Sequence, residues 1–362
     1  MFIAGIDAHA TYLVVAIVSK DGTLVQKATR VQVRHPEKLK ELLAPFRPLE
    51  AVVETSLSWP WLDELLSGWD VRLVLAHAKR LRAIASSNYK SDQVDAELLA
   101  RMHLAGLIPA VFIRCREQRE FATLVRHRVV LVRQRTALLN RIHAQLQMAG
   151  LHLARGRLQT RAARVWLREV AWLKLGNESR RLIRSHLRLI DHLRPLVRSV
   201  DRRIDQVADT IPAVSLLRTI PGIGAYRGLL IAAEVLPIQR FPQPKHLVSY
   251  AGLAPRSRQS GTKPVRYASI PAGANRWLRG ALVRAVVSHS QHAPDSWLSH
   301  YYTQQKARLG WQKARIATAR KLARAIHAML RTGEVWRNES DVPVQRGELH
   351  FTHVAETTES SD

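Results

Sequence analysis

Short apolar stretches alternate with amphipathic segments along the first 110 residues. Phe2–Asp7 and Tyr12–Ser19 have the apolar, β-branched content of buried strands, and the Asp21-Gly22 turn leads into a third strand over Leu24–Val33. Beyond them, helical leucine spacing alternates with buried-type strands. The predicted elements are a helix over Pro36–Phe46, a strand over Ala51–Glu54, a helix over Trp59–Leu66, a strand over Val71–Ala76 and a helix over Ala78–Ala85. Three strands in hairpin order followed by this alternation predict an α/β layer of the RNase H-like type.

From Cys115 the pattern changes to long helices. Leu124, Leu131 and Leu138 recur every seven residues, and a basic stretch over 155–181 follows. A second apolar seam then alternates at heptad spacing through Ile190, Leu193, Val197, Val200, Ile204, Val207 and Ile211. Pro195 lies inside this seam and either kinks the helix or marks its start. Two arginine-rich helices with apolar seams predict either an antiparallel hairpin within one chain or an arm for self-association.

The remaining chain divides into a third block and a tail. Residues 213–330 begin with VSLLRTIPGIGAYRGLLIAAEV, continue through a Pro/Gly/Ser-rich loop over Pro237–Gly273, and end in helices over Asn275–Arg331. Residues 332–362 carry two basic and seven acidic residues without periodicity, which predicts disorder. The expected organisation is therefore an α/β domain over 1–112, a basic helical connector over 113–212, a mainly helical C-terminal domain over 213–331 and an acidic tail.

Composition narrows the class of protein. With 362 residues and an apolar fraction of 46%, the chain is long and apolar enough for two or three cores. The single Cys115 excludes a disulfide scaffold and a zinc site built from cysteines. No basic segment precedes the first apolar stretch, and Asp7 and His9 interrupt it, which argues against a signal peptide or membrane span. We expect a cytoplasmic protein with no membrane partner.

Net charge indicates the partner. The net charge of the chain is +27, and it is unevenly distributed. Residues 1–110 hold 13 Lys/Arg and 12 Asp/Glu, whereas residues 111–362 hold 43 Lys/Arg and 17 Asp/Glu. A positive field of this size attracts polyanions and gains affinity by releasing their counterions. Ribosome association and an anionic membrane are the other interpretations of such a charge. Because the sequence lacks a sustained amphipathic Trp/Lys face, nucleic acid is the expected partner.

Four carboxylates fall at points of the expected fold where they could meet. Asp7 lies at a strand end where alternation favours an apolar residue, and Glu54 ends a second, neighbouring strand. Asp92 and Asp95, in KSDQVDAELLARM, share one face of a first helical turn. Gathered carboxylates repel one another unless a cation neutralises them, and hard oxygen ligands suit Mg²⁺ or Mn²⁺. Such ions are the usual machinery of phosphodiester displacement.

Each carboxylate also has a structural interpretation when taken alone. Asp92 could be an N-cap, Asp95 a partner of the helix dipole, and Glu54 a member of an ion pair. Their joint occurrence at the right points of one fold pattern favours the functional interpretation.

Two further motifs suggest contact with nucleic acid. In Ile220–Gly224 (IPGIG), Gly222 and Gly224 allow backbone N–H groups to face an anion at a helix N-terminus, as in a helix–hairpin–helix; a plain helix-connecting turn is the alternative. In the later loop, Ser260 is surrounded by cationic side chains, so it is either a phosphate ligand or a nucleophile. These cations are Arg256, Arg258, Lys263 and Arg266.

Taken together, these motifs resemble the DEDD transposases of bacterial insertion sequences, the insertion-sequence family 110. The motifs GID, VVET, KSDxxD, IPGIG and AGLxPxxxxSG occur in the family's order across residues 1–330, and a GNRxLR-type sequence follows them. The last element reads GANRWLRGAL here, with an extra alanine after the glycine.

The resemblance implies a mechanism. It implies a RuvC-like N-terminal domain whose metal-binding tetrad falls on Asp7, Glu54, Asp92 and Asp95, with Mg²⁺ or Mn²⁺ as the cofactor. It further implies a C-terminal transposase domain whose nucleophilic serine falls on Ser260, with Ser249 and Ser257 as alternatives, and strand exchange in double-stranded DNA through a covalent 5′-phosphoserine link. In the family a structured bridge RNA guides the reaction, and protomers joined through a coiled coil share composite sites. A homodimer or homotetramer is therefore expected.

Two other functions remain open on the sequence. One is a metal-dependent, junction-resolving endonuclease in which Ser260 only binds phosphate. The other is a non-catalytic RNA-binding scaffold with a degenerate nuclease fold.

Overall fold

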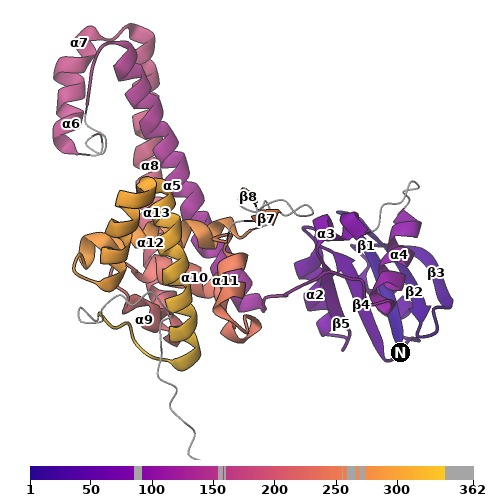
Figure 1. Ribbon diagram of the computed structural model, residues 1–362. Helices are drawn as coiled ribbons and strands as arrows, with labels where there is room; N and C mark the ends of the chain where they lie inside the picture. The colour runs from indigo at the N-terminus through magenta and orange to yellow at the C-terminus, as the bar shows by residue number, and fades with distance from the viewer. Residues whose placement is uncertain are drawn as a thin grey trace, which may run out of the picture. The chain divides into compact units, whose positions relative to one another are not determined.

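The computed structural model describes residues 1–84, 92–153, 158, 160–254, 256–258, 266–268 and 274–338. The chain forms two compact units, Met1–Cys115 and Arg116–Asp362 (Figure 1). The first is an α/β unit and the second is mostly helical. The expected α/β region followed by a mainly helical part is therefore confirmed. The predicted tail lies outside the described residues from 339 onward.

A six-stranded mixed sheet forms the centre of the first unit. Its strands lie in the order β3-β2-β1-β4-β5-β6. The first three are antiparallel neighbours, β4 runs parallel to β1, β5 runs parallel to β4, and β6 pairs antiparallel with β5. The strands span Phe2–Ala8 (β1), Tyr12–Ser19 (β2), Leu24–Gln32 (β3), Leu49–Glu54 (β4), Arg72–Ala76 (β5) and Ala110–Val111 (β6).

Helices cover both faces of this sheet, because strand residues alternate between the two faces. Ile6 and its same-face neighbours pack with α1 (Pro36–Leu43) and α2 (Trp59–Ser67). Ile3 and its same-face neighbours pack with α3 (Ala78–Ile84) and α4 (Asp92–Leu104). Odd-numbered residues of β1 therefore face α4.

Gly5 permits the close packing of α4 on β1. A Cβ atom at this position would lie 1.9 Å from the carbonyl oxygen of Ala96 and 2.8 Å from the backbone nitrogen of Ala100. Any side chain would therefore push α4 away from the strand. Since Gly5 and Asp7 lie on the same face of β1, this contact brings the first turn of α4 to the end of the strand that carries Asp7.

Two 33-residue helices dominate one part of the second unit. They are α5 (Arg116–Met148) and α8 (Asn177–Asp209), which lie side by side in Figure 1. Between them come α6 (Arg161–Trp166), a π-helical turn over Leu167–Ala171 and α7 (Trp172–Lys174).

The heptad seams of these two helices pack within the chain. Leu138 and Ile142 of α5 share one apolar cluster with Ile183 and Ile190 of α8. The antiparallel hairpin is therefore present. Helix α8 continues through Pro195, so this proline does not mark its start. The coiled-coil description, the connector's boundary at residue 212 and self-association stay predictions.

A separate apolar core holds the remaining helices. These are α9 (Pro212–Arg218), α10 (Ala225–Val235), α11 (Pro244–Tyr250), α12 (Arg276–His292) and α13 (Trp297–Thr332), with a 3₁₀ turn at Ile238–Arg240 and a short hairpin of β7 (Arg256–Arg258) and β8 (Arg266–Ala268). The prediction of an irregular loop over Pro237–Gly273 is therefore wrong for its described part. Pro244 occupies the first turn of α11, where proline is tolerated because that N–H needs no helical partner. In the described residues, no helix is both long and apolar enough to cross a membrane.

Candidate active site

Asp7 and Glu54 are placed by two adjacent parallel strands. Ile6 pairs with Val53, so Asp7 and Glu54 occupy the next position along β1 and β4. Side-chain alternation puts both on the face covered by α4. Asp92 and Asp95 lie in the first turn of α4, which Gly5 brings to this edge of the sheet.

Three of these carboxylates influence one another electrostatically. Burial raises the pKa of Asp7, and the nearby charges of Asp92 and Asp95 raise it further, while His9 opposes the shift. A raised pKa means that the ionised form of Asp7 is disfavoured in this environment. A cation bound at this cluster would favour the ionised form of Asp7 and so offset the effect of burial.

Glu54 lies at the same edge with a different partner. Its side chain is 36% exposed, and its Oε1 atom is 3.9 Å from an Nη atom of Arg82 in α3. At this distance and exposure the ion pair is weak. Among the described residues, one group of three potential metal ligands has its ligand atoms all within 4.8 Å of one another, and it consists of Asp7, His9 and Asp92. The compact part of the site thus contains two members of the expected tetrad, with Asp95 close enough to perturb Asp7.

His9 and Tyr12 belong to this site but were not predicted from the sequence. His9 Nε2 lies 2.9 Å from Asp7 Oδ2 and 3.3 Å from Asp92 Oδ2. The Tyr12 hydroxyl donates a hydrogen bond of 2.9 Å to Asp92 Oδ2, and its ring stacks on His9 with centroids 4.4 Å apart. The guanidinium of Arg30 also lies over the Tyr12 ring, 3.5 Å from its centroid.

The pKa of the Tyr12 hydroxyl depends mainly on Asp92. Its hydrogen bond to Asp92 raises the pKa of the Tyr12 hydroxyl, with further contributions from desolvation and the Asp92 charge. Asp92 is therefore held by a tyrosine that stays protonated and donates. Nothing in the sequence distinguishes His9 and Tyr12 beyond their position beside Asp7, where β1 turns into β2.

The donor set fits a divalent cation. Asp7 and Asp92 each offer a carboxylate oxygen, and His9 offers a ring nitrogen. Carboxylates suit Mg²⁺ and Mn²⁺, while an imidazole nitrogen is a more favourable ligand for Mn²⁺ and later transition metals than for Mg²⁺.

The expected serine loop is described only in part. Ser260 and Lys263 lie outside the described residues. Arg256 and Arg258 belong to β7 and Arg266 to β8, and Arg258 pairs with Arg266 across the hairpin. Ser257 pairs with Tyr267. Ser249 is exposed near the end of α11.

The two glycines of the IPGIG turn differ in their surroundings. Gly222 has φ of 84°, and a Cβ there would lie 2.7 Å from the backbone of Ser288 and of His289 in α12. Its carbonyl accepts a hydrogen bond of 2.6 Å from Arg227. Gly222 therefore serves helix packing, as in a connecting turn. Gly224 precedes α10 and has open space around it. A nucleic-acid contact at this turn stays a prediction.

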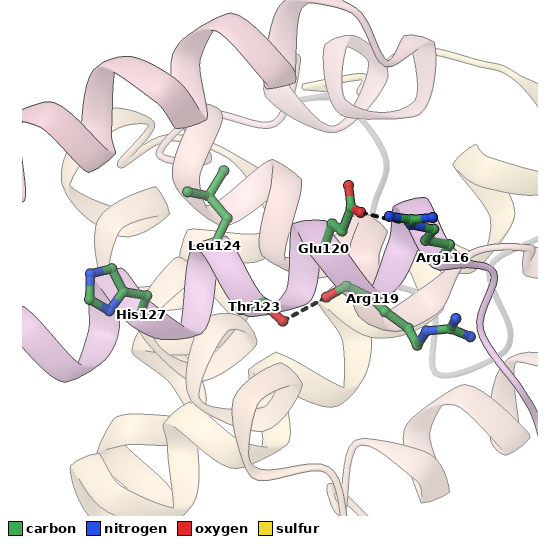
Figure 2. Close-up of a pocket in the computed structure, with 6 residues that line it drawn as sticks. All are labelled: Arg116, Arg119, Glu120, Thr123, Leu124 and His127. Atoms are coloured by element: carbon green, nitrogen blue, oxygen red, sulfur yellow. Dashed lines mark hydrogen bonds and ion pairs between the residues drawn. The ribbon is translucent and has the colours of Figure 1, made fainter. Parts of the chain in front are cut away.

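An open hollow of about 440 Å³ lies along α5. The residues that line it, drawn in Figure 2, are Arg116, Arg119, Glu120, Thr123, Leu124 and His127. Arg116 pairs with Glu120 at 3.2 Å, and the Thr123 hydroxyl donates to the Arg119 carbonyl at 2.9 Å. Because the Thr123 hydroxyl donates its proton to a carbonyl of its own helix, it is not an activated nucleophile.

Comparisons with known proteins identify relatives over most of the chain. A family model described as Transposase, for the DEDD transposase domain of IS110 elements, matches residues 4–150. A second model, described as Transposase IS116/IS110/IS902 family, matches residues 214–303. The two matches contain the carboxylate cluster and the serine loop respectively.

Three relatives show the range of similarity. The transposase for insertion sequence element IS1111A of Coxiella burnetii is 29% identical over 283 residues, which cover 75% of this chain and 74% of that protein. The transposase for insertion sequence element IS1328 of Yersinia enterocolitica is 26% identical over 341 residues, or 92% of this chain and 97% of that protein. A pilin gene-inverting protein of Moraxella bovis is 36% identical over 102 residues, which cover 27% of this chain and 32% of that protein.

Proposed function

Because this chain belongs to the IS110 family of transposases, we propose that it recombines double-stranded DNA by metal-dependent strand cleavage and serine-mediated strand exchange. The observation that carries the proposal is the cluster of Asp7, His9 and Asp92 at the edge of the sheet, within the segment matched by the DEDD model. A stable α/β fold does not need a carboxyl at this half-buried position, where burial disfavours the ionised form of Asp7.

We assign the metal to the tetrad of a RuvC-like, RNase H-fold domain. Asp7, Glu54, Asp92 and Asp95 would hold Mg²⁺ or Mn²⁺, with His9 beside them. Such an ion supplies Lewis-acid activation of a phosphoryl oxygen. The residues themselves orient one another: Tyr12 donates to Asp92, and Arg30 lies over the Tyr12 ring.

The covalent step is assigned to Ser260. Its Oγ would attack a backbone phosphorus, giving up its proton to a base, while the P–O3′ bond breaks and the 3′ oxygen leaves as a hydroxyl after taking up a proton. The product is a 5′-phosphoserine ester. A 3′ hydroxyl of another strand would then attack this phosphorus and release the serine hydroxyl, which joins the new strands. The support is the second family match over 214–303 and the cationic sequence around Ser260.

The partners follow from charge and from the family. Residues 111–362 contain 43 basic and 17 acidic residues, and this positive excess favours binding of a polyanion. We assign the polyanion as DNA together with a structured bridge RNA. A homodimer or homotetramer would bring a metal site and a serine from different protomers together. Insertion sequences are part of bacterial DNA, which lies in the cytoplasm, and we expect the chain to act there.

One assay tests the proposal. Full-length wild type, Asp7→Asn and Ser260→Ala are incubated with joined element ends, the transcript of the flanking DNA, and Mg²⁺ or Mn²⁺. Both variants are expected to lose recombination by about two orders of magnitude or more, as when one preorganised active-site group is removed. Only wild type and Asp7→Asn retain the serine needed for an SDS-resistant adduct. Normal cleavage by Ser260→Ala would instead establish a metal-dependent endonuclease in which this serine only binds phosphate.

A further inference from the structure

The second unit contains a buried carboxylate that the proposed chemistry does not use. Glu234 lies near the end of α10, and its side chain has no exposure to solvent. A buried charge is costly unless it is paired and hydrogen-bonded. Glu234 Oε1 accepts from Arg126 Nη2 of α5 at 2.5 Å, and its Oε2 accepts from Asn275 Nδ2 at 2.6 Å.

Asn275 uses its whole hydrogen-bonding capacity. Its Oδ1 accepts from the backbone N–H groups of Trp277 and Leu278 at 3.1 and 3.0 Å, so it caps α12. Its Nδ2 donates to Glu234 and also to the Tyr250 hydroxyl at 3.0 Å. Two donors and two acceptor sites are all that an asparagine amide offers. Aspartate would cap the helix equally well but would oppose Glu234 with a second negative charge.

The same residues join the two ends of the segment that carries the proposed nucleophile. Tyr250 is the last residue of α11, and Asn275 immediately precedes α12. The backbone N–H of Asn275 donates to the Tyr250 carbonyl at 2.9 Å. Tyr250 and Asn275, the residues that flank positions 251–274 and Ser260, are therefore in direct contact.

Tyr250 is itself fixed from another side. The guanidinium of Arg240 lies 4.8 Å from the Tyr250 ring centroid, and its Nη2 donates to the backbone carbonyl of Glu234. The Phe241 ring lies 5.3 Å from the Tyr250 ring. Asn275 thus contacts the C-terminal end of α10 directly, and Tyr250 contacts it through Arg240. The hydrogen bond from Arg126 to Glu234 connects this end of α10 to α5.

We propose that Glu234 and Asn275 are positioning residues for strand exchange: they hold the two ends of segment 251–274 together and in register with α5. This inference rests on the assignment of the covalent step to Ser260. Both act through hydrogen bonds to other residues of the fold, Arg126 and Tyr250 among them. Their effect is on the rate of the covalent step and not on the charge that attracts DNA, since neither is a cation.

A polarity swap tests the proposal. In Asn275→Asp the cap of α12 is kept and the donor to Glu234 is lost; in Glu234→Gln the introduced amide faces the Asn275 amide. In the double variant, the amide introduced at position 234 can donate to the carboxylate introduced at position 275, while its carbonyl still accepts from Arg126. Full-length proteins are compared for recombination rate, for SDS-resistant adduct on a duplex of joined element ends, for affinity for that duplex, and for thermal stability. Thr160→Ala, which removes the cap of α6, is the matched control.

Each single variant is expected to slow adduct formation and recombination by about 10- to 100-fold, the effect of an ångström-scale misplacement, with unchanged duplex affinity. The double variant recovers most of the rate, and Thr160→Ala keeps the wild-type rate. Wild-type rates in the single variants, or a double variant no faster than either, would overturn the proposal. Absence of any Ser260-dependent adduct in wild type would overturn the assignment of Ser260 and this inference with it.

Discussion

At the scale of single residues, the candidate site combines groups that the sequence indicates with groups that it does not. Asp7, Asp92 and Asp95 were predicted, because a carboxylate in an apolar strand and a pair in a first helical turn break the expected pattern. His9 and Tyr12 were missed, because no periodicity says that a turn folds back onto Asp7 and Asp92. Glu234 was missed too, although a charged residue within the apolar run LLIAAEV is a signal for a buried pair.

Asp7→Asn is predicted to stabilise the protein while inactivating it. The pKa of Asp7 is raised by burial, so the folded state binds its proton more tightly than the unfolded state, and stability is lost as pH rises through the folded pKa. In EDTA at pH 7 the variant should therefore melt slightly above wild type. The difference should close below about pH 4, where the unfolded-state carboxyl is also protonated.

Adding Mn²⁺ provides the control for that experiment. Ligand binding to the folded state stabilises wild type, whereas the variant, lacking one ligand, should respond weakly. A variant that melts below wild type in EDTA at pH 7, or that gains as much from Mn²⁺, would contradict this account of Asp7.

At the scale of helices and strands, most of the first unit could be predicted and several connections could not. The alternation of apolar strands and leucine-spaced helices identified β1 to β5 in order. The predicted strand to Val33 and helix to Phe46 end instead at Gln32 and Leu43. The two-residue β6 carries no pattern of its own, and α11 was missed because a seven-residue helix beginning at Pro244 resembles a proline-rich loop.

Gly5→Ala is predicted to separate α4 from β1. The new methyl group would lie 1.9 Å from the Ala96 carbonyl oxygen, so the helix must move, at a cost of about 3 kcal/mol, the upper end for overpacking. The first turn of α4, with Asp92 and Asp95, moves with it, so Mn²⁺ affinity measured by calorimetry should fall together with the unfolding free energy measured in urea.

The matched variant is Gly176→Ala. No atom lies within 4 Å of a Cβ placed there, and the position precedes α8 in the other unit. Because Gly176 is the N-cap of α8, where alanine is less favourable than glycine, the loss should be about 1 kcal/mol or less, with unchanged Mn²⁺ binding. Equal losses from both glycines would refute the packing role of Gly5.

At the scale of the whole molecule, charge and chemistry are separated along the chain. Residues 1–110 are nearly neutral and hold the carboxylates, whereas 111–362 hold almost all of the positive excess. In the proposed function, the nearly neutral α/β unit would attract polyanions weakly, and the helical unit would supply the general affinity for nucleic acid.

Affinity for duplex DNA is therefore predicted to depend steeply on salt. If six to ten phosphates are contacted, the association constant should fall by about 10³- to 10⁵-fold between roughly 50 and 200 mM salt. Fluorescence anisotropy at several salt concentrations measures the slope. Asp7→Asn serves as the comparison, since removing one acidic group adds no cation and should leave the slope as it is. A slope near zero would exclude counterion release as the source of affinity.

Helix α5 takes part in two cores, with Val125 in that of the C-terminal helices and Leu146 in the cluster shared with α8. At 1.5 Å per residue its 33 residues extend about 50 Å as one hydrogen-bonded rod. Such a rod tilts more readily than it bends. A tilt of the α5–α8 hairpin would therefore also move the turn of α5 that carries Val125 and Arg126, and with it the hydrogen bond to Glu234.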